Sequence, residues 1–115
     1  MQQVVDLQRD DGFRSTDVEL LSIAMDPQQD WRRAGGELGI ELPMLSDEGN
    51  QTATEYGVMR WAMAGGEPGH TFVLVDANGR VAWVRDYGAP ENGGAMYVPP
   101  EEIVDQVTAT LIASP

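Results

Sequence analysis

The stretch that decides the fold is Pro68-Gly69-His70-Thr71-Phe72-Val73-Leu74-Val75-Asp76-Ala77-Asn78-Gly79-Arg80-Val81-Ala82-Trp83-Val84-Arg85-Asp86. Two runs rich in β-branched and aromatic residues flank the pair Asn78-Gly79. This pair favours a tight turn because both positions tolerate positive φ. Phe72 and Leu74 in the first run, and Val81 and Trp83 in the second, are also placed to give alternating faces. The stretch therefore predicts a β-hairpin.

Upstream of the hairpin, residues 18–25 form a nearly continuous apolar run, which is typical of a strand buried on both faces. Asp26-Pro27 then favours a helix over residues 27–38, with Asp26 as N-cap, and Gly39 suits the end of that helix. An earlier helix is predicted over residues 3–13, weakened by Gly12, and residues 14–17 form a polar connector.

The remaining segments complete a layered α/β order. Residues 41–47 are extended but interrupted by Pro43, which indicates at best an edge piece. A short helix from residue 50 or 51 to residue 56 is followed by a predicted loop over 58–67, and residues 88–94 form a glycine-rich loop. The last helix begins at Pro99-Pro100-Glu101-Glu102. Its expected buried stripe is Ile103, Val104, Val107 and Leu111.

Composition excludes several classes of function. Nineteen acidic residues face seven basic ones, all of them arginine, for a formal charge of −12, which opposes direct binding to nucleic acid. No stretch approaches the roughly 20 apolar residues that a membrane span needs, so no membrane partner is expected. The first residues show no basic region followed by an apolar run, so we expect a cytoplasmic location.

The chain has no cysteine, which removes disulfides, thiolate nucleophiles and sulfur-ligated metals together. Its single histidine and scattered acids do not form a metal-ligand pattern. Residues 76–79 superficially resemble a calcium loop, but the later ligand positions and the closing glutamate are missing, so we interpret them as a turn. The sequence therefore predicts no catalytic, cofactor-binding or metal-binding residue in this chain, and no cofactor.

Some side chains have both a functional and a structural interpretation. His70 would need an acid and a nucleophile nearby to act as a base, and without a thiol the structural role is favoured. Met59 and Met63 near Trp61 could form an apolar patch for a partner, although burial in the loop is the simpler interpretation. The tryptophans are expected to pack in the core rather than to line a ligand pocket: Trp31, Trp61 and Trp83.

Five phrases resemble, in the right order, those of the peroxiredoxin-like redoxins, the alkyl hydroperoxide reductase and thiol-specific antioxidant family with a thioredoxin fold. Residues 18–26, VELLSIAMD, are similar to the family's second strand, and residues 42–47, LPMLSD, to its fPlLsD phrase. Residues 53–58, ATEYGV, resemble a..YgV, and the hairpin from His70 to Val81 resembles TFviD..G.i. Residues 86–103 resemble the tail of a redoxin subgroup, and the similarity spans about residues 3–113.

The resemblance implies a thioredoxin-like layered α/β domain with a C-terminal β-hairpin and a final helix. In the family, a first strand leads through a loop to a helix that carries the peroxidatic cysteine in a TxxC or CxxC setting, and Met1 falls inside what resembles that helix. We therefore expect residues 1–115 to be a single truncated redoxin domain, inactive alone. The full-length form would reduce peroxides or exchange disulfides.

Two further positions bear on the resemblance. Peroxiredoxins often carry an arginine ahead of the TF pair, where this chain has Gly69, and Arg60 or Arg85 could approach that place instead. Pro68 could correspond to the cis-proline of thioredoxin folds, with an ordinary trans turn proline as the alternative.

The resemblance also implies a gap, because the first strand of the family lies centrally, between the second strand and the hairpin. Its absence leaves backbone donors and acceptors unpaired on two sides. We expect the chain to close this gap by pairing with another copy, as a homo-oligomer through exposed sheet edges, or by pairing residues 18–25 directly with residues 71–75. An alternative function is therefore a cysteine-free redoxin remnant that acts as a dimerising or protein-interaction module.

Overall fold

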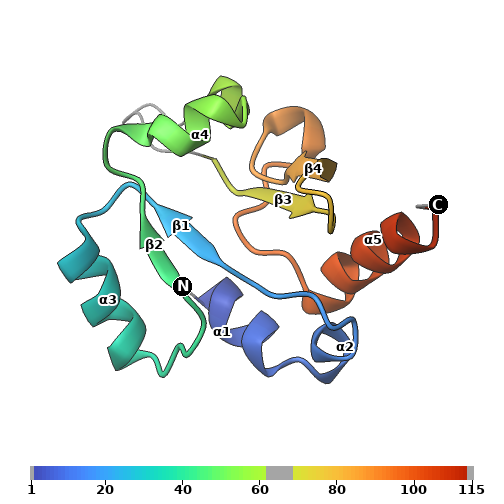
Figure 1. The fold of residues 1–115 in the computed structure, drawn as a ribbon, viewed down its shortest axis with the longest axis horizontal. Coiled ribbons are helices and arrows are strands. Elements are labelled where there is room, and N and C mark those ends of the chain that lie inside the picture. The colour runs from blue at the N-terminus through green and yellow to red at the C-terminus, as the bar shows by residue number, and fades with distance from the viewer. Residues whose placement is uncertain (1, 62–68, 114–115) are drawn as a thin grey trace.

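The computed structural model describes residues 2–61 and 69–113 (Figure 1). Its α-helices are α1 (Gln2–Arg9), α2 (Asp11–Arg14), α3 (Gln28–Glu37), α4 (Gln51–Glu55) and α5 (Pro100–Ala113). Its strands are β1 (Ser22–Ala24), β2 (Met44–Ser46), β3 (Thr71–Val75) and β4 (Val81–Asp86). Helix α3 contacts β2, while α1, α2 and α5 contact one another in a separate group.

The predicted helix over residues 3–13 is interrupted at Asp10. This residue has an extended backbone, and its carboxylate accepts a hydrogen bond from the backbone N–H of Phe13 at 2.8 Å. Asp10 is therefore the N-cap of the short helix α2. The cap divides the predicted helix into α1 and α2, and it lies two residues before Gly12, where the sequence pattern placed the weak point.

Strand β1 is much shorter than the apolar run that predicted it. It covers three residues and pairs in parallel with β2, which confirms the predicted extended piece over residues 41–47. The expected burial on both faces is wrong, since Leu21 and Ile23 are 51% and 49% exposed. Helix α3 begins at Gln28 with Pro27 as N-cap and no side-chain cap bond, so the prediction of Asp26 as cap is also wrong.

The hairpin forms as predicted, with β3 antiparallel to β4 and registers from Thr71↔Asp86 to Val75↔Val81. The backbone conformation of its turn, and the bonds that stabilise it, differ from the expected ones. Gly79 has φ +79°, whereas Asn78 is not among the residues with positive φ. Instead, the Asp76 carboxylate accepts hydrogen bonds from the backbone N–H groups of Asn78 and Arg80 at 2.9 and 3.0 Å. A side chain thus stabilises this five-residue connection.

The loops and the last helix also differ in detail from the predictions. The predicted loop over 58–67 begins with a 3₁₀ turn, Val58–Trp61, and its remainder lies outside the described residues. The glycine-rich loop over 88–94 contains the 3₁₀ turn Pro90–Asn92. Helix α5 buries most of its expected stripe, but Leu111 is 44% exposed, which contradicts its assignment to the core. The main core cluster contains Leu7, Phe13, Leu74, Tyr87, Val98, Ile103 and Val107.

The strands form two separate sheets within the described part of the chain. Strand β1 pairs only with β2, and β3 pairs only with β4. Direct pairing of residues 18–25 with residues 71–75, one of the two expected ways to close the sheet, is therefore not what the chain adopts. Among residues 2–61 and 69–113, no strand pairs with the edge of β1 that faces away from β2 or with the edge of β3 that faces away from β4.

Helix α1 connects the part of the fold that contains β1, β2 and α3 with the part that contains β3, β4 and α5, and it does so through two glutamines. The Gln3 side-chain amide, 6% exposed, donates to the backbone C=O of Val98 at 2.8 Å and accepts from the N–H of the same residue at 2.7 Å. Near the C-terminal end of the same helix, the Gln8 side-chain amide donates a hydrogen bond to the backbone C=O of Gly39 at 3.0 Å and accepts one from the backbone N–H of Glu41 at 2.6 Å. Each glutamine thus pairs with backbone much as a neighbouring strand would.

Replacing Gln3 should destabilise the fold strongly. Gln3→Ala leaves the buried N–H and C=O of Val98 without partners, and each such group costs about 1–3 kcal/mol. We expect the free energy of unfolding in urea to fall by about 2–4 kcal/mol. The matched control is Gln2→Ala, which removes only an exposed hydrogen bond to Asp6 and should cost less than about 0.5 kcal/mol. Equal losses for the two variants would contradict this role of Gln3.

Candidate functional site

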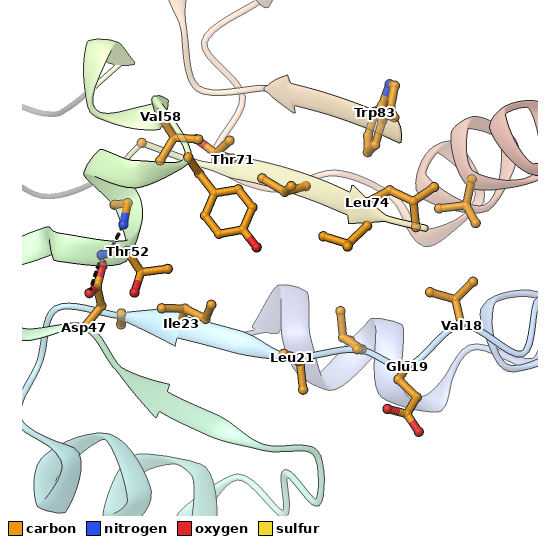
Figure 2. A pocket seen from close by; sticks show the side chains of 18 of the residues that line it. Val18, Glu19, Leu21, Ile23, Asp47, Thr52, Val58, Thr71, Leu74 and Trp83 are labelled. Atoms are coloured by element: carbon orange, nitrogen blue, oxygen red, sulfur yellow. Dashed lines mark hydrogen bonds between the residues drawn. The ribbon is translucent and has the colours of Figure 1, made fainter. Parts of the chain in front are cut away.

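A groove of about 340 Å³ lies between β1 and β3, where the two sheets face each other without pairing (Figure 2). One wall is the extended segment 18–25 and the other is β3. The groove has two kinds of apolar lining. Leu74, Phe13 and Val107 belong to the buried core and form its closed side, whereas Ile23 and Val75 are 49% and 43% exposed. The site is therefore an open apolar channel bounded by strand edges.

Two acidic residues, Glu19 and Asp47, are among those that line the groove. In Figure 2 the Glu19 side chain points away from β3, and the Asp47 carboxylate points toward the start of α4. The Asp47 carboxylate is 8% exposed and accepts backbone hydrogen bonds from Thr52 and Ala53, both at 2.9 Å, which hold the pKa of Asp47 below its ordinary value. Its own N–H donates to the C=O of Ala24 at 2.7 Å. Asp47 thereby fixes the start of α4 against the end of β1.

Two buried polar atoms at the start of β3 have no hydrogen-bond partner. They are the Thr71 hydroxyl oxygen, which lines the groove, and Oδ2 of Asp86, its cross-strand neighbour. The side chain of Asp86 is fully buried, and its other oxygen accepts from the backbone N–H of Gly88 at 2.8 Å. Buried polar groups in proteins are nearly always paired, so the Thr71 hydroxyl is an unused hydrogen-bonding group on the groove wall, while Asp86 is not among the groove-lining residues.

His70 directly precedes Thr71 in the chain and is held by structural contacts. Its Nε2 is 3.0 Å from Oε1 of Gln3, which as an amide oxygen accepts the hydrogen bond and so selects the Nε2-protonated tautomer. Its ring packs edge-on to Phe72 at 5.3 Å between centroids. Burial lowers the pKa of His70, and the charge of Asp86 opposes that shift in part. These contacts fit the structural role expected for this histidine, which stays a prediction.

The other residues singled out in the sequence lie in varied places. The Arg85 guanidinium stacks over the Tyr87 ring at 5.1 Å, and neither Arg85 nor Arg60 is among the groove-lining residues, so the structure brings neither to the site. Trp83 packs against the core, as expected, and also lines the groove. Trp31 is partly buried in α3. Pro68, Met63 and the side chain of Trp61 lie outside the described residues.

Sequence reasoning missed the residues that shape this site, namely Gln3, Asp47 and Thr71. Asp47 carried a usable signal, because an aspartate a few residues before a short helix is a common cap. The residues that the structure describes contain no cluster of three histidine or acidic side chains suited to a metal ion. None of the described helices has the length and apolar character needed to cross a bilayer.

Comparison with known proteins identifies the family. The model of the AhpC/TSA family matches residues 2–84, which is most of the chain. This chain therefore belongs to the AhpC/TSA family, and the resemblance found in its sequence is confirmed. Among curated proteins, no sequence matches it significantly.

Solved structures of AhpC proteins have the same fold. The Enterococcus faecalis AhpC matches with a TM-score of 0.74 and 22% identity, covering 96% of this chain and 65% of its own. The Mycobacterium tuberculosis AhpC matches with a TM-score of 0.71 and 20% identity, covering 97% and 61%. The Mycobacterium bovis AhpC matches with a TM-score of 0.67 and 22% identity, covering 96% and 63%. The fold is thus thioredoxin-like and incomplete, since this chain spans less than two thirds of each relative.

The burial of His70 should make stability depend on pH. Its pKa is lowered on folding from the ordinary value of about 6.5, so the unfolded chain binds more protons in this range. The stabilising contribution is complete above pH 6.5 and is lost as pH falls through the lowered pKa. We expect the free energy of unfolding to rise as the pH increases toward about 6.5, and His70→Gln should flatten that rise. If the free energy of unfolding changed with pH in the same way for the parent chain and for His70→Gln, the burial of His70 would not be the cause of the pH dependence.

Proposed function

We propose that this chain is the cysteine-free portion of a peroxiredoxin-like thiol oxidoreductase, which in its full-length form reduces peroxides or exchanges disulfides. Membership of the AhpC/TSA family supports the activity class. The single observation that carries the proposal is the groove between β1 and β3, two strands that each have one partner in the part of the chain that the structure describes. The resemblance places the family's first strand there, directly before the cysteine.

In this proposal the chain supplies the scaffold and not the nucleophile. Without a thiol it cannot form a sulfenic acid or a disulfide, so alone it has no peroxidase chemistry. Its contribution is to hold helix α1, in which the resemblance places the cysteine-bearing helix, through the amides of Gln3 and Gln8. Gly69 stands where related enzymes often carry an arginine, so activation of a thiolate from this side is weak.

We expect this chain alone to consume hydrogen peroxide no faster than buffer, with dithiothreitol as reductant, because it has no cysteine to turn over. A saturable rate from the chain alone would contradict this expectation. Oxidation of its methionines would be stoichiometric, not catalytic.

A chimaera tests the scaffold role directly. Placing the first strand, loop and cysteine-bearing turn of a peroxiredoxin of this family ahead of Gln2 should create a saturable peroxidase rate, slower than that of the donor because the arginine is missing. Changing the grafted cysteine to serine is the control and should abolish the rate. A folded chimaera without cysteine-dependent peroxidase activity would overturn the proposed function.

A second candidate is a protein-interaction module without thiol chemistry, either dimerising or binding another protein. The observation that favours it is the exposure of Leu21, Ile23, Val73 and Val75, four apolar side chains that line one groove. Isolated exposed apolar residues are common, but a contiguous group marks an interaction site. An upstream reading frame that encodes a strand and a cysteine motif favours the first candidate. We keep a cytoplasmic location as a prediction for both.

A further inference from the structure

We propose that the side chain of Gln28 covers the outer edge of β2, the edge that faces away from β1, and so prevents this edge from pairing with a strand of a second copy of the chain. The inference goes beyond the peroxidase proposal, because it concerns neither thiol chemistry nor the groove between β1 and β3. Three features support it: the backbone groups at this edge, the hydrogen bonds of Gln28 and the packing of α3 on β2.

The direction of the backbone groups in β2 identifies those at its outer edge. The C=O of Pro43 accepts a hydrogen bond from the first residue of β1 at 3.0 Å, and the N–H of Asp47 donates one to the last residue of β1 at 2.7 Å. Both groups therefore point toward β1. Since successive residues of a strand direct their backbone groups to opposite edges, the C=O of Met44 and the N–H of Ser46 point outward.

Gln28 satisfies both outward groups with one side chain. Its Nε2 donates to the C=O of Met44 at 2.8 Å, and its Oε1 accepts from the N–H of Ser46 at 3.1 Å. A residue of a parallel neighbouring strand makes the same pair of bonds with its own N–H and C=O. The amide thus occupies the place of one residue of a third strand, and an incoming strand would have to displace it.

Helix α3 holds this amide in place without a large apolar contact. The helix lies beside β2 (Figure 1), and Gly35 is the residue of α3 that is buried. A Cβ atom at Gly35 would come within 3.2 Å of Cγ of Met44, so the helix backbone rests directly on that side chain. Just before the helix, the C=O of Asp26 accepts a hydrogen bond from the hydroxyl of Ser46. Because α3 buries so little apolar surface, the two bonds of Gln28 are a main attachment of its first turn.

An uncovered edge at β2 would suit a second copy of the same chain. Leu45, between the two outward groups, is 41% exposed, and a strand edge beside exposed apolar side chains is a template for pairing. A two-fold axis would bring identical edges together, so that the outward groups of each copy pair with those of the other. The charge of −12 on each copy opposes this contact, and salt screens that repulsion.

The test compares Gln28→Met with Gln29→Met by sedimentation velocity in about 0.5 M sodium chloride, which screens the repulsion between exposed charges. Methionine keeps the length and the helix propensity of glutamine but makes neither bond. Gln29 is exposed in the same turn of α3, so its replacement adds the same side chain without uncovering the edge. The dissociation constant for self-association should fall at least about tenfold in Gln28→Met and stay within about twofold of the parent value in Gln29→Met.

A double variant separates this role from a purely structural one. If Gln28 only stabilised the fold, its loss would lower stability without creating a specific contact through β2. Adding Leu45→Glu to Gln28→Met should return the dissociation constant to within about threefold of the parent value, because like charges opposite each other destabilise strand pairing.

Amide hydrogen exchange of the parent chain tests the cover without any substitution. The N–H of Ser46 should exchange at least about tenfold more slowly than in an unstructured peptide, although it points away from β1. This measurement decides the question if Gln28→Met does not fold.

Four results would overturn the inference. They are equal self-association of the parent chain and Gln28→Met, equal gains for the two methionine variants, self-association of Gln28→Met that persists with Leu45→Glu, and unprotected exchange at Ser46. None of them involves the cysteine of the peroxidase chimaera, so the two proposals fail independently.

Discussion

A β-strand has two hydrogen-bonding edges, and in this chain β1 and β3 each use only one within the described residues. Unpaired strand edges are costly when shielded from water and open to new partners when exposed, so this constraint governs the rest of the molecule. It explains why β1 is only three residues long despite its apolar sequence, since a strand with one partner has half the hydrogen bonds to hold it. It also explains why Ile23, expected in a buried strand, is half exposed.

The two halves of the fold are joined by helices and side chains. Gln3 ties α1 to the segment before α5, and through His70 to the start of β3, while Gln8 ties the same helix to the connection that leads into β2. Leu7, between them, is almost fully buried in the core cluster. Helix α1 therefore takes over part of the bridging that a central strand would provide.

Local signals in the sequence predicted the parts of the fold that depend on neighbours in the chain. Asn78-Gly79 located the hairpin, Gly39 the end of α3, and Pro99-Pro100 the start of α5. The five ordered phrases identified the family, which the family model confirms over residues 2–84. Some features that sequence reasoning missed are local, such as the bonds of Asp47 to the start of α4, but the largest ones depend on contacts between distant segments. The bonds of Gln3 cross 95 positions, and the length of β1 depends on a neighbour that its own residues do not encode.

A molecule bound in the groove would also change the free energy of unfolding of this chain. Leu21, Ile23, Val73 and Val75 remain partly in contact with water, so part of the hydrophobic stabilisation of this fold is realised only when something covers them. An occupant that binds the folded chain, and not the unfolded one, stabilises it by RT ln(1 + [L]/Kd), which is about 2.7 kcal/mol at a hundredfold excess over Kd. For a domain of this size, that is a large share of the total stability. Selection for stability would then act on the groove even if no chemistry occurred there.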